Sequence, residues 1–292
     1  TMNKFFIELS PFTISVTSDI SLVKTNLETL YPDSIFLDEN KNHLIDYHVS
    51  SNFSSLIRKF IKPQSVFAHD GFEPFMGLPL NHAYASLEWG INYVVATNAL
   101  EYVNIHSGVV AHNDDAILFP APPGSGKSTL TAYLQGQTNW RLLSDEMTLI
   151  FTNTHTAVPF TRPICLKNKS CELVKSWYPD ARFSTIARNT HKGDVIHVSP
   201  SELSWQKRND PATIKAIVFP QFKAGQATEI YQLNNTQAFM MLAENAFNFN
   251  ILGETGFNTL TSIIETVPAF EIQYSDVEDI RQFLEQDVLN VK

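Results

Sequence analysis

The chain has 292 residues, of which 43% are hydrophobic, and a formal net charge of −9. This length and composition predict a globular protein of one large or two smaller domains with a sizeable core. The acidic balance argues against extended contact with nucleic acid or anionic lipid, which both need basic patches. Because the sequence lacks a long apolar run and an apolar leader, we expect neither a membrane span nor a secretory signal.

The chain has two cysteines, Cys165 and Cys171. Their number and spacing fit neither a disulfide framework nor a zinc site. We therefore interpret them as reduced thiols and expect a cytoplasmic protein.

The first part of the chain, residues 1–80, has the pattern of a small α+β lobe. Loosely alternating apolar residues over 4–16 predict one or two strands interrupted at Pro11. A helix is predicted over 20–30, where apolar residues recur at steps of three and four. Short apolar pieces between turn-forming residues predict further strands over 35–80. No catalytic constellation stands out in this lobe.

A helical pattern over 81–98 is expected to link the lobe to the following domain. A strand is predicted over 100–106. Two apolar runs, 108–111 and 116–119, flank the polar tetrad 112–115, which predicts a β-hairpin. Since parallel P-loop folds usually reach this point through a helical crossover, the hairpin predicts a partly antiparallel sheet.

The hairpin leads directly into a glycine-containing segment, Ala121-Pro122-Pro123-Gly124-Ser125-Gly126-Lys127-Ser128-Thr129. The segment fits the phosphate-binding pattern G-x-x-x-x-G-K-[ST], except that Ala121 replaces the first glycine. Such a loop surrounds phosphates with backbone N–H groups, while Lys127 would reach the β/γ-phosphates and Ser128 would bind Mg²⁺. Ala121 is tolerable if its φ is negative. A short helix over Ser128–Gln135, closed by Gly136, would place the phosphates at its N-terminus.

A strand over Arg141–Ser144 is predicted to deliver two acidic residues, Asp145 and Glu146. Adjacent side chains on a strand point to opposite faces, so only one should face the γ-phosphate. We assign Asp145 as the group that accepts the proton of an attacking hydroxyl or orients it. Glu146 would support the metal or a basic neighbour. With Ser128, these two residues are the candidate magnesium ligands.

Further site candidates are basic or imidazole side chains. His106 ends the strand beside the one that enters the loop, which would bring it near the β/γ-phosphates. Arg162, Arg188 and Lys192 are candidates for phosphate or substrate contacts. Residues 178–210 are polar and irregular, and predict a mobile loop region interrupted by a strand.

The remaining elements follow from periodicity and turn signals. They are a hairpin over 147–160, strands over 214–219 and 270–274, a helix over 236–247 and a C-terminal helix. The C-terminal helix is predicted to open with a capping box of Ser275 and Glu278.

Five segments occur in an order that is more specific than any one of them. They are Leu87-Glu88-Trp89-Gly90-Ile91-Asn92, Ile105-His106-Ser107-Gly108-Val109-Val110, Pro120 to Thr129, Leu142-Leu143-Ser144-Asp145-Glu146 and Arg162-Pro163-Ile164-Cys165-Leu166-Lys167. This succession resembles the HPr-kinase-related kinase A family, within the HPr serine kinase/phosphorylase superfamily, over about residues 5–275. The resemblance implies an α/β fold for residues 81–292: a P-loop catalytic domain of the HPr kinase/phosphoenolpyruvate carboxykinase type, with a mixed, substantially antiparallel sheet.

The resemblance also implies roles for single residues. His106 matches the family's active-site histidine, Lys127 and Ser128 match its phosphate and magnesium positions, and Asp145 matches the aspartate that acts as base in the kinase reaction. The same aspartate is the acid in the reverse phosphorolysis. An oligomer is implied as well.

The sequence departs from the family in the metal and loop positions. Glu146 stands where the HPr kinases have a second aspartate, and their metal-binding glutamate has no clear counterpart around Val158–Arg162. The basic residue of their mobile loop corresponds to Arg182, Arg188 or Lys192, and the sequence leaves this choice open. HPr as the acceptor and the phosphorylase activity also stay open.

Together these patterns predict an ATP- and Mg²⁺-dependent kinase that transfers the γ-phosphoryl group to a hydroxyl, a serine of a protein or peptide in the first instance. One alternative is a kinase of small hydroxyl compounds. The other is an ATP-responsive binding module that has lost its chemistry.

Overall fold

The computed structural model describes residues 2–55 and 60–291 and has a mixed α/β fold. It divides into two compact units, residues 1–95 with 162–199 and residues 96–161 with 200–292. The lobe boundary expected at residue 80 is therefore not a unit boundary. Most of helix α2 (Ala83–Asn98) belongs to the first unit, together with a segment that follows much later in the chain.

The first unit contains a five-stranded sheet in the order β1-β2-β3-β4-β5. Its strands are β1 (Asn3–Leu9), β2 (Phe12–Ser18), β3 (Tyr47–Phe53), β4 (Gln64–His69) and β5 (Leu78–Pro79). Its helical elements are α1 (Ser21–Leu30), η1 (Asp33–Ile35) and η3 (Leu80–His82), besides α2. β2 and β3 are parallel and the other pairs are antiparallel. The strands predicted around Pro11 and the helix over 20–30 are confirmed.

A second sheet of the first unit is three-stranded and antiparallel, in the order β12-β14-β13. It consists of β12 (Ile164–Lys167), β13 (Ala187–Thr190) and β14 (Gly193–Val198), with helix α4 (Ser170–Trp177) between β12 and β13. The strand predicted near Val195–Val198, within the irregular region 178–210, is confirmed as β14. The rest of that region is not all loop, because it also contains β13 and a short helix, Glu202–Gln206. Asn189 and Gly193 have positive φ and allow the tight reversal between β13 and β14.

The second unit is built on a nine-stranded mixed sheet in the order β6-β10-β11-β15-β8-β7-β9, with β17 beside β15 and β16 beside β17. The strands are β6 (Tyr102–Ile105), β7 (Ser107–His112), β8 (Asp115–Pro120), β9 (Trp140–Ser144), β10 (Thr148–Phe151), β11 (Thr156–Val158), β15 (Ala212–Phe222), β16 (Glu229–Gln232) and β17 (Ala269–Tyr274). β15 is parallel to β8 and β17, and the other pairs are antiparallel. The mixed sheet and the hairpin of β7 and β8 are as predicted.

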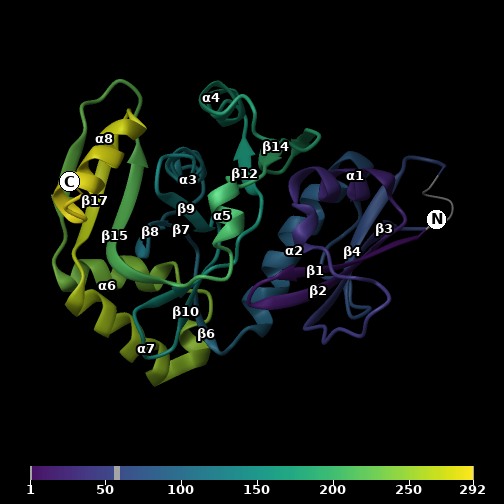
Figure 1. The fold of residues 1–292 in the computed structure, drawn as a ribbon, viewed down its shortest axis with the longest axis horizontal. Coiled ribbons are helices and arrows are strands. Elements are labelled where there is room, and N and C mark those ends of the chain that lie inside the picture. Colours follow the sequence, from purple (N-terminus) through teal and green to yellow (C-terminus); the bar gives the residue numbers. More distant parts are fainter. Residues whose placement is uncertain (1, 56–59, 292) are drawn as a thin grey trace. The chain divides into compact units, whose positions relative to one another are not determined.

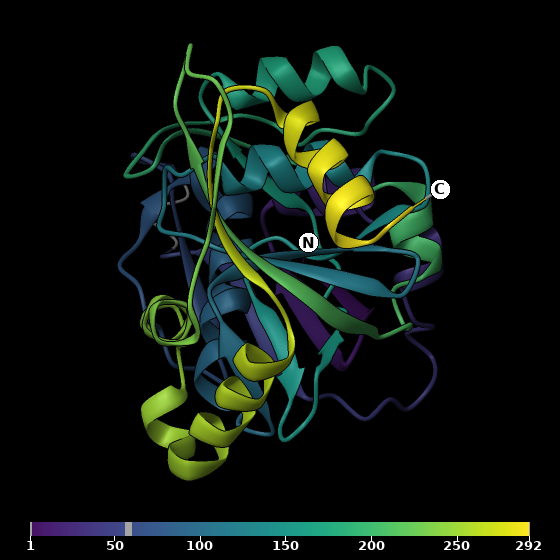
Figure 2. The ribbon, with the colours of Figure 1, turned by 90° about the vertical axis from the view of Figure 1, so that its left-hand side faces the viewer.

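Helices cover both faces of this sheet, as Figure 1 and Figure 2 show. On one face lie α3 (Lys127–Gln135) and α8 (Val277–Phe283), which continues into a π-helical turn, Leu284–Val288. On the other face lie α6 (Asn235–Glu244) and α7 (Phe249–Thr266). Side chains of α6 and α7, among them Leu242, Leu260 and Ile263, pack with the strands in the main hydrophobic core. The short α5 (Glu202–Gln206) completes the unit.

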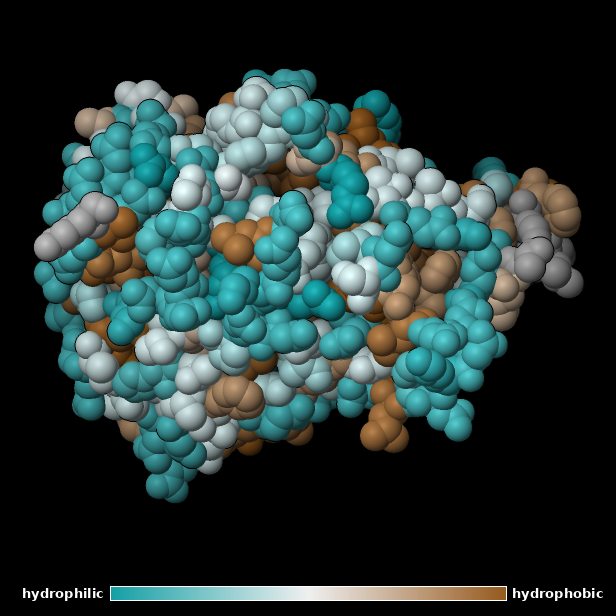
Figure 3. Space-filling view, in the orientation of Figure 1, coloured by the Kyte–Doolittle hydropathy of each residue, from teal (hydrophilic) through white to brown (hydrophobic). Residues whose placement is uncertain are grey.

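The surface carries both polar and apolar residues. On the face drawn in Figure 3, hydrophilic residues prevail and hydrophobic ones occur in separate groups, which is ordinary for a protein surface. In the part of the chain that the structure describes, no helix combines the length and the hydrophobicity needed to cross a bilayer.

Candidate functional site

The glycine-containing segment forms the connection between β8 and α3. Gly124 and Gly126 both have a φ near +90°, at 89° and 90°, and Gly126 is the N-cap residue of α3. Such left-handed conformations favour glycine over any residue with a Cβ atom. Ala121 is 2% exposed and is not among the residues with positive φ, so its methyl group carries no backbone penalty. The predicted order of strand, loop and helix is confirmed.

Gly126 is also constrained by its surroundings. A Cβ atom there would lie 2.8 Å from Tyr274 Oη and 3.0 Å from Phe222 Cβ, whereas one on Gly124 would meet nothing within 4 Å. We expect Gly126→Ala to destabilise the fold by about 2 kcal/mol or more, through left-handed strain and overpacking together. Gly124→Ala is the matched control and should lose only about 1 kcal/mol, because strain alone remains. Urea unfolding of both variants tests this, and equal losses would contradict it.

Lys127 is the first residue of α3 and is buried, with 7% of its surface exposed. The helix lies close to β7 at this point. A Cβ atom on Gly108 would be 3.5 Å from Lys127 Cγ and only 2.6 Å from Thr131 Cγ2. Gly108 therefore allows the first turn of α3 to approach the sheet, which explains a glycine in an otherwise apolar strand.

Asp145 follows the last residue of β9 and is 6% exposed. Its carboxylate accepts two hydrogen bonds from α3: Oδ1 from Thr131 Oγ1 at 2.8 Å and Oδ2 from Ser128 Oγ at 3.0 Å. Burial raises the pKa of Asp145 above its ordinary value, and Glu146 adds to this, although the Lys127 ammonium and the two hydroxyls oppose it. The structure thus brings Lys127, Ser128 and Asp145 together at the start of α3.

Thr131 also belongs to this site and was not among the residues predicted from the sequence. It is fully buried, and its hydroxyl is shared between the Asp145 carboxylate and the backbone oxygen of Ser128. Its spacing from the motif could have indicated it, because residues three and four positions apart lie on the same face of a helix. Thr131 follows Ser128 by three positions and Lys127 by four.

The oxygen atoms at the site suit a magnesium ion that also binds phosphate and water. Mg²⁺ is usually held by one or two carboxylates besides phosphate oxygens and water molecules. Ser128 Oγ and Asp145 Oδ2 are 3.0 Å apart, and Glu146, the residue after Asp145, is half-buried. Among the described residues, no cluster of three or more His, Cys, Asp or Glu side chains could hold a metal without other ligands.

His106 lies between β6 and β7 and is half-buried. The next residue, Ser107, pairs with Pro120 at the end of β8, just before the loop. The backbone N–H of His106 donates to Asn245 O at 2.7 Å, and its ring lies 5.6 Å from the Phe247 ring, centroid to centroid. β7 and β8 thus place the backbone of His106 close in the sheet to the start of the loop.

Arg162, the first of the basic candidates, takes part in a buried network in the first unit. It donates hydrogen bonds to Glu88 Oε2, to the Glu88 backbone oxygen and to Asn92 Oδ1. Tyr31 and Tyr84 donate to the other oxygen of Glu88 at 2.8 and 2.6 Å. Burial raises the pKa of Glu88, but Arg162, His197 and the Tyr84 hydroxyl together favour the carboxylate, so the net effect is a lowered pKa. The guanidinium of Arg162 is thus engaged by groups of its own unit.

The other basic candidates also belong to the first unit. Arg188 is exposed and forms an ion pair with Asp194 at 3.3 Å. Lys192 Nζ lies 4.9 Å from the centroid of the Trp89 ring, and Arg182 donates to Ser199 Oγ. These basic residues lie in the first unit, whereas the loop, Lys127 and Asp145 lie in the second unit.

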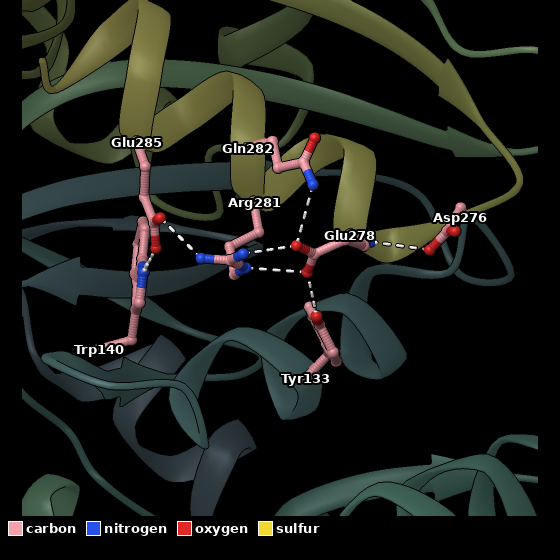
Figure 4. A network of polar contacts seen from close by, with 7 residues as sticks. All are labelled: Tyr133, Trp140, Asp276, Glu278, Arg281, Gln282 and Glu285. Carbon is pink, nitrogen blue, oxygen red and sulfur yellow. Dashed lines mark hydrogen bonds and ion pairs between the residues drawn. The ribbon is translucent and has the colours of Figure 1, made fainter. Parts of the chain in front are cut away.

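A polar network ties α8 to α3 and β9 (Figure 4). Glu278 accepts hydrogen bonds from Tyr133 of α3 and from Arg281. Arg281 also donates to Glu285, which accepts from Trp140 Nε1 of β9 at 2.8 Å. The helix is capped by Asp276, so the predicted capping box of Ser275 is wrong; the Ser275 hydroxyl instead donates to Gln226 O. Through these hydrogen bonds α8 contacts both the helix that carries Lys127 and the strand that precedes Asp145.

This network predicts acid sensitivity. Hydrogen bonds from Arg281 lower the pKa of Glu278 from 4.5 to about 2. The stabilisation is therefore complete above about pH 4.5 and is lost as the pH falls towards 2. Because 32% of the Glu278 side chain is exposed, we expect no more than about 1 kcal/mol.

Urea unfolding between pH 6 and pH 3 can measure this contribution. Glu278→Gln should flatten the acid-side loss of stability by about that amount, whereas Glu254→Gln, an exposed change on α7, should leave the profile of the parent protein. The same slope in both variants would contradict the assignment.

No protein-family model matches the chain, and no curated protein matches its sequence.

Proposed function

We propose that the chain is an ATP- and Mg²⁺-dependent kinase that transfers the γ-phosphoryl group to a hydroxyl, with a serine of a protein or peptide as acceptor. One observation carries the proposal. A buried carboxylate, Asp145, is held by Ser128 and Thr131 next to the N-terminus of a helix that a glycine-rich loop opens.

The loop and the start of α3 would bind the phosphates. Free N–H groups and the helix dipole favour an anion at this N-terminus, and the positive φ of Gly124 and Gly126 gives the loop its curvature. The Lys127 ammonium would balance the charge on the β- and γ-phosphates. Bound with the nucleotide, Mg²⁺ would neutralise charge on the same phosphates, with Ser128, Asp145 and Glu146 as candidate ligands.

Asp145 would act on the acceptor. Burial raises its pKa, which makes the carboxylate a stronger base than an exposed aspartate. Its hydrogen bonds to α3 hold it beside Lys127's helix turn, so the attacking hydroxyl and the phosphoryl group would meet near one carboxylate. Positioning and charge stabilisation account for most of phosphoryl-transfer catalysis. His106 is proposed as a second group near the phosphates.

The proposal includes the fold type and the acceptor class. The mixed sheet, with β8 entering the loop from an antiparallel hairpin, is compatible with a catalytic domain of the HPr kinase/phosphoenolpyruvate carboxykinase type. A relation to the HPr-kinase-related kinases rests on the order of motifs in the sequence. It favours a peptide or protein acceptor and an oligomeric enzyme in the cytoplasm.

A single-turnover assay with γ-labelled ATP and Mg²⁺ tests the function. Purified protein is incubated with serine-containing peptides encoded next to its gene and, in parallel, with a panel of small hydroxyl compounds. We expect label on a peptide serine. Label on a small compound would establish the small-molecule kinase, and nucleotide binding without transfer to any partner would establish a binding module.

A further inference from the structure

Three parallel strand ends lie next to one another in the second unit. β8, β15 and β17 are parallel neighbours, and β8 leads into the glycine-rich loop. β15 ends at Phe222, which pairs in register with Tyr274 at the end of β17. In open α/β sheets, ligands bind outside the carboxyl ends of parallel strands. A nucleotide held by the loop would therefore extend along the ends of β15 and β17.

Phe222 is fixed directly against the loop. Its backbone N–H donates to Ser125 O at 3.0 Å. Its Cβ would lie 3.0 Å from a Cβ atom on Gly126, so the start of its side chain faces the residue that caps α3. The position of Phe222 relative to the phosphate loop is thus set by the backbone.

The ring of Phe222 is exposed on one side and packs against the buried ring of Tyr274. It is 51% exposed, whereas Tyr274 is 1% exposed. The two rings meet edge to face, with centroids 5.8 Å apart and an interplanar angle of 75°. Aromatic pairs prefer such a geometry, and a buried partner restrains the exposed ring. A flat apolar surface held in place beside an anion-binding loop suits the planar base of a nucleotide.

We infer that the Phe222 ring stacks on the purine base of the nucleotide whose phosphates the loop binds. The inference rests on the proposed function and extends it to the choice of donor. The loop alone would accept any chain of phosphates, while a stacking ring selects a nucleoside triphosphate over an inorganic polyphosphate. Tyr274 acts as a positioning residue that holds the ring.

Calorimetric titration with Mg-ATP and with Mg-tripolyphosphate separates the two parts of the site. Base–aromatic stacking contributes enough that Phe222→Ala should weaken Mg-ATP binding about 5- to 100-fold. Affinity for Mg-tripolyphosphate should stay within about twofold, since the loop and Lys127 are unchanged. Phe222→Tyr should retain ATP affinity, because the ring remains.

A matched control is Phe257→Ala on α7, where the ring is 49% exposed and lies in the same unit. It should leave both titrations unchanged. Undiminished ATP affinity in Phe222→Ala overturns the inference, as does an equal loss for both ligands, which would indicate damage to the loop. A parent protein that binds neither ligand would contradict the proposed function itself.

Discussion

Replacing Lys127 by Met should lower phosphoryl transfer about 100- to 1,000-fold, the loss typical of removing one charge-stabilising donor. Met keeps the unbranched stem that lies against Gly108 and removes only the charge. The β- and γ-phosphates would then lack their cation at the start of α3. Mg-ATP should also stabilise the protein far less, because the stabilisation by a ligand falls as its dissociation constant rises.

Single-turnover kinetics and thermal unfolding with and without Mg-ATP measure both effects. Lys215→Met is the matched control, since Lys215 is on the same sheet, its side chain is 48% exposed and it faces Asp115 at 3.7 Å. The control should keep parental turnover and parental stabilisation by Mg-ATP. Unchanged nucleotide binding and turnover in Lys127→Met would refute the site.

Local signals predicted most of the second unit's sheet. The polar tetrad at 112–115 gave the hairpin of β7 and β8, in which Asn113 takes the positive φ that a tight turn needs. Helix α7 was not predicted, because Gly253 and Gly256 are poor helix formers and Gly253 is not helical at all. Its C-terminal half is held by Leu260 and Ile263 in the core. Packing of this kind has no local signature.

Sequence patterns indicated the site residues that belong to one motif or that follow a predicted strand. The loop, Lys127 and Ser128 form one motif, and Asp145 follows the strand predicted after it. The surroundings of Arg162 could not be predicted in this way. As an isolated cation it suggested a phosphate contact, but its partner Glu88 lies 74 positions earlier in the chain. Only the folded chain brings such a pair together, and no spacing rule relates the two positions.

Asp145→Asn should separate binding from transfer. Asn has nearly the same shape and can still bond to the Ser128 and Thr131 hydroxyls, so the loop should keep its conformation. Mg-ATP affinity should fall by no more than about threefold, because Ser128, Glu146 and the phosphates remain as candidate magnesium ligands. Without a base, transfer should fall about a thousandfold, within the range known for general acid–base groups. Calorimetry with Mg-ATP and single-turnover kinetics test the two halves.

The same substitution should raise the melting temperature. The pKa of Asp145 is higher in the folded protein than its ordinary value of 3.8, so at neutral pH the ionised carboxylate is less stable in the fold than in the unfolded chain. A neutral side chain removes this cost.

Asp115→Asn is the matched control, because Asp115 lies at the opposite end of β8 and its side chain is 44% exposed. It should alter neither transfer nor melting temperature appreciably. Transfer retained in Asp145→Asn would assign the base elsewhere. A parallel loss of Mg-ATP affinity and transfer would instead assign Asp145 to the metal alone, and the gain in stability distinguishes both results from misfolding.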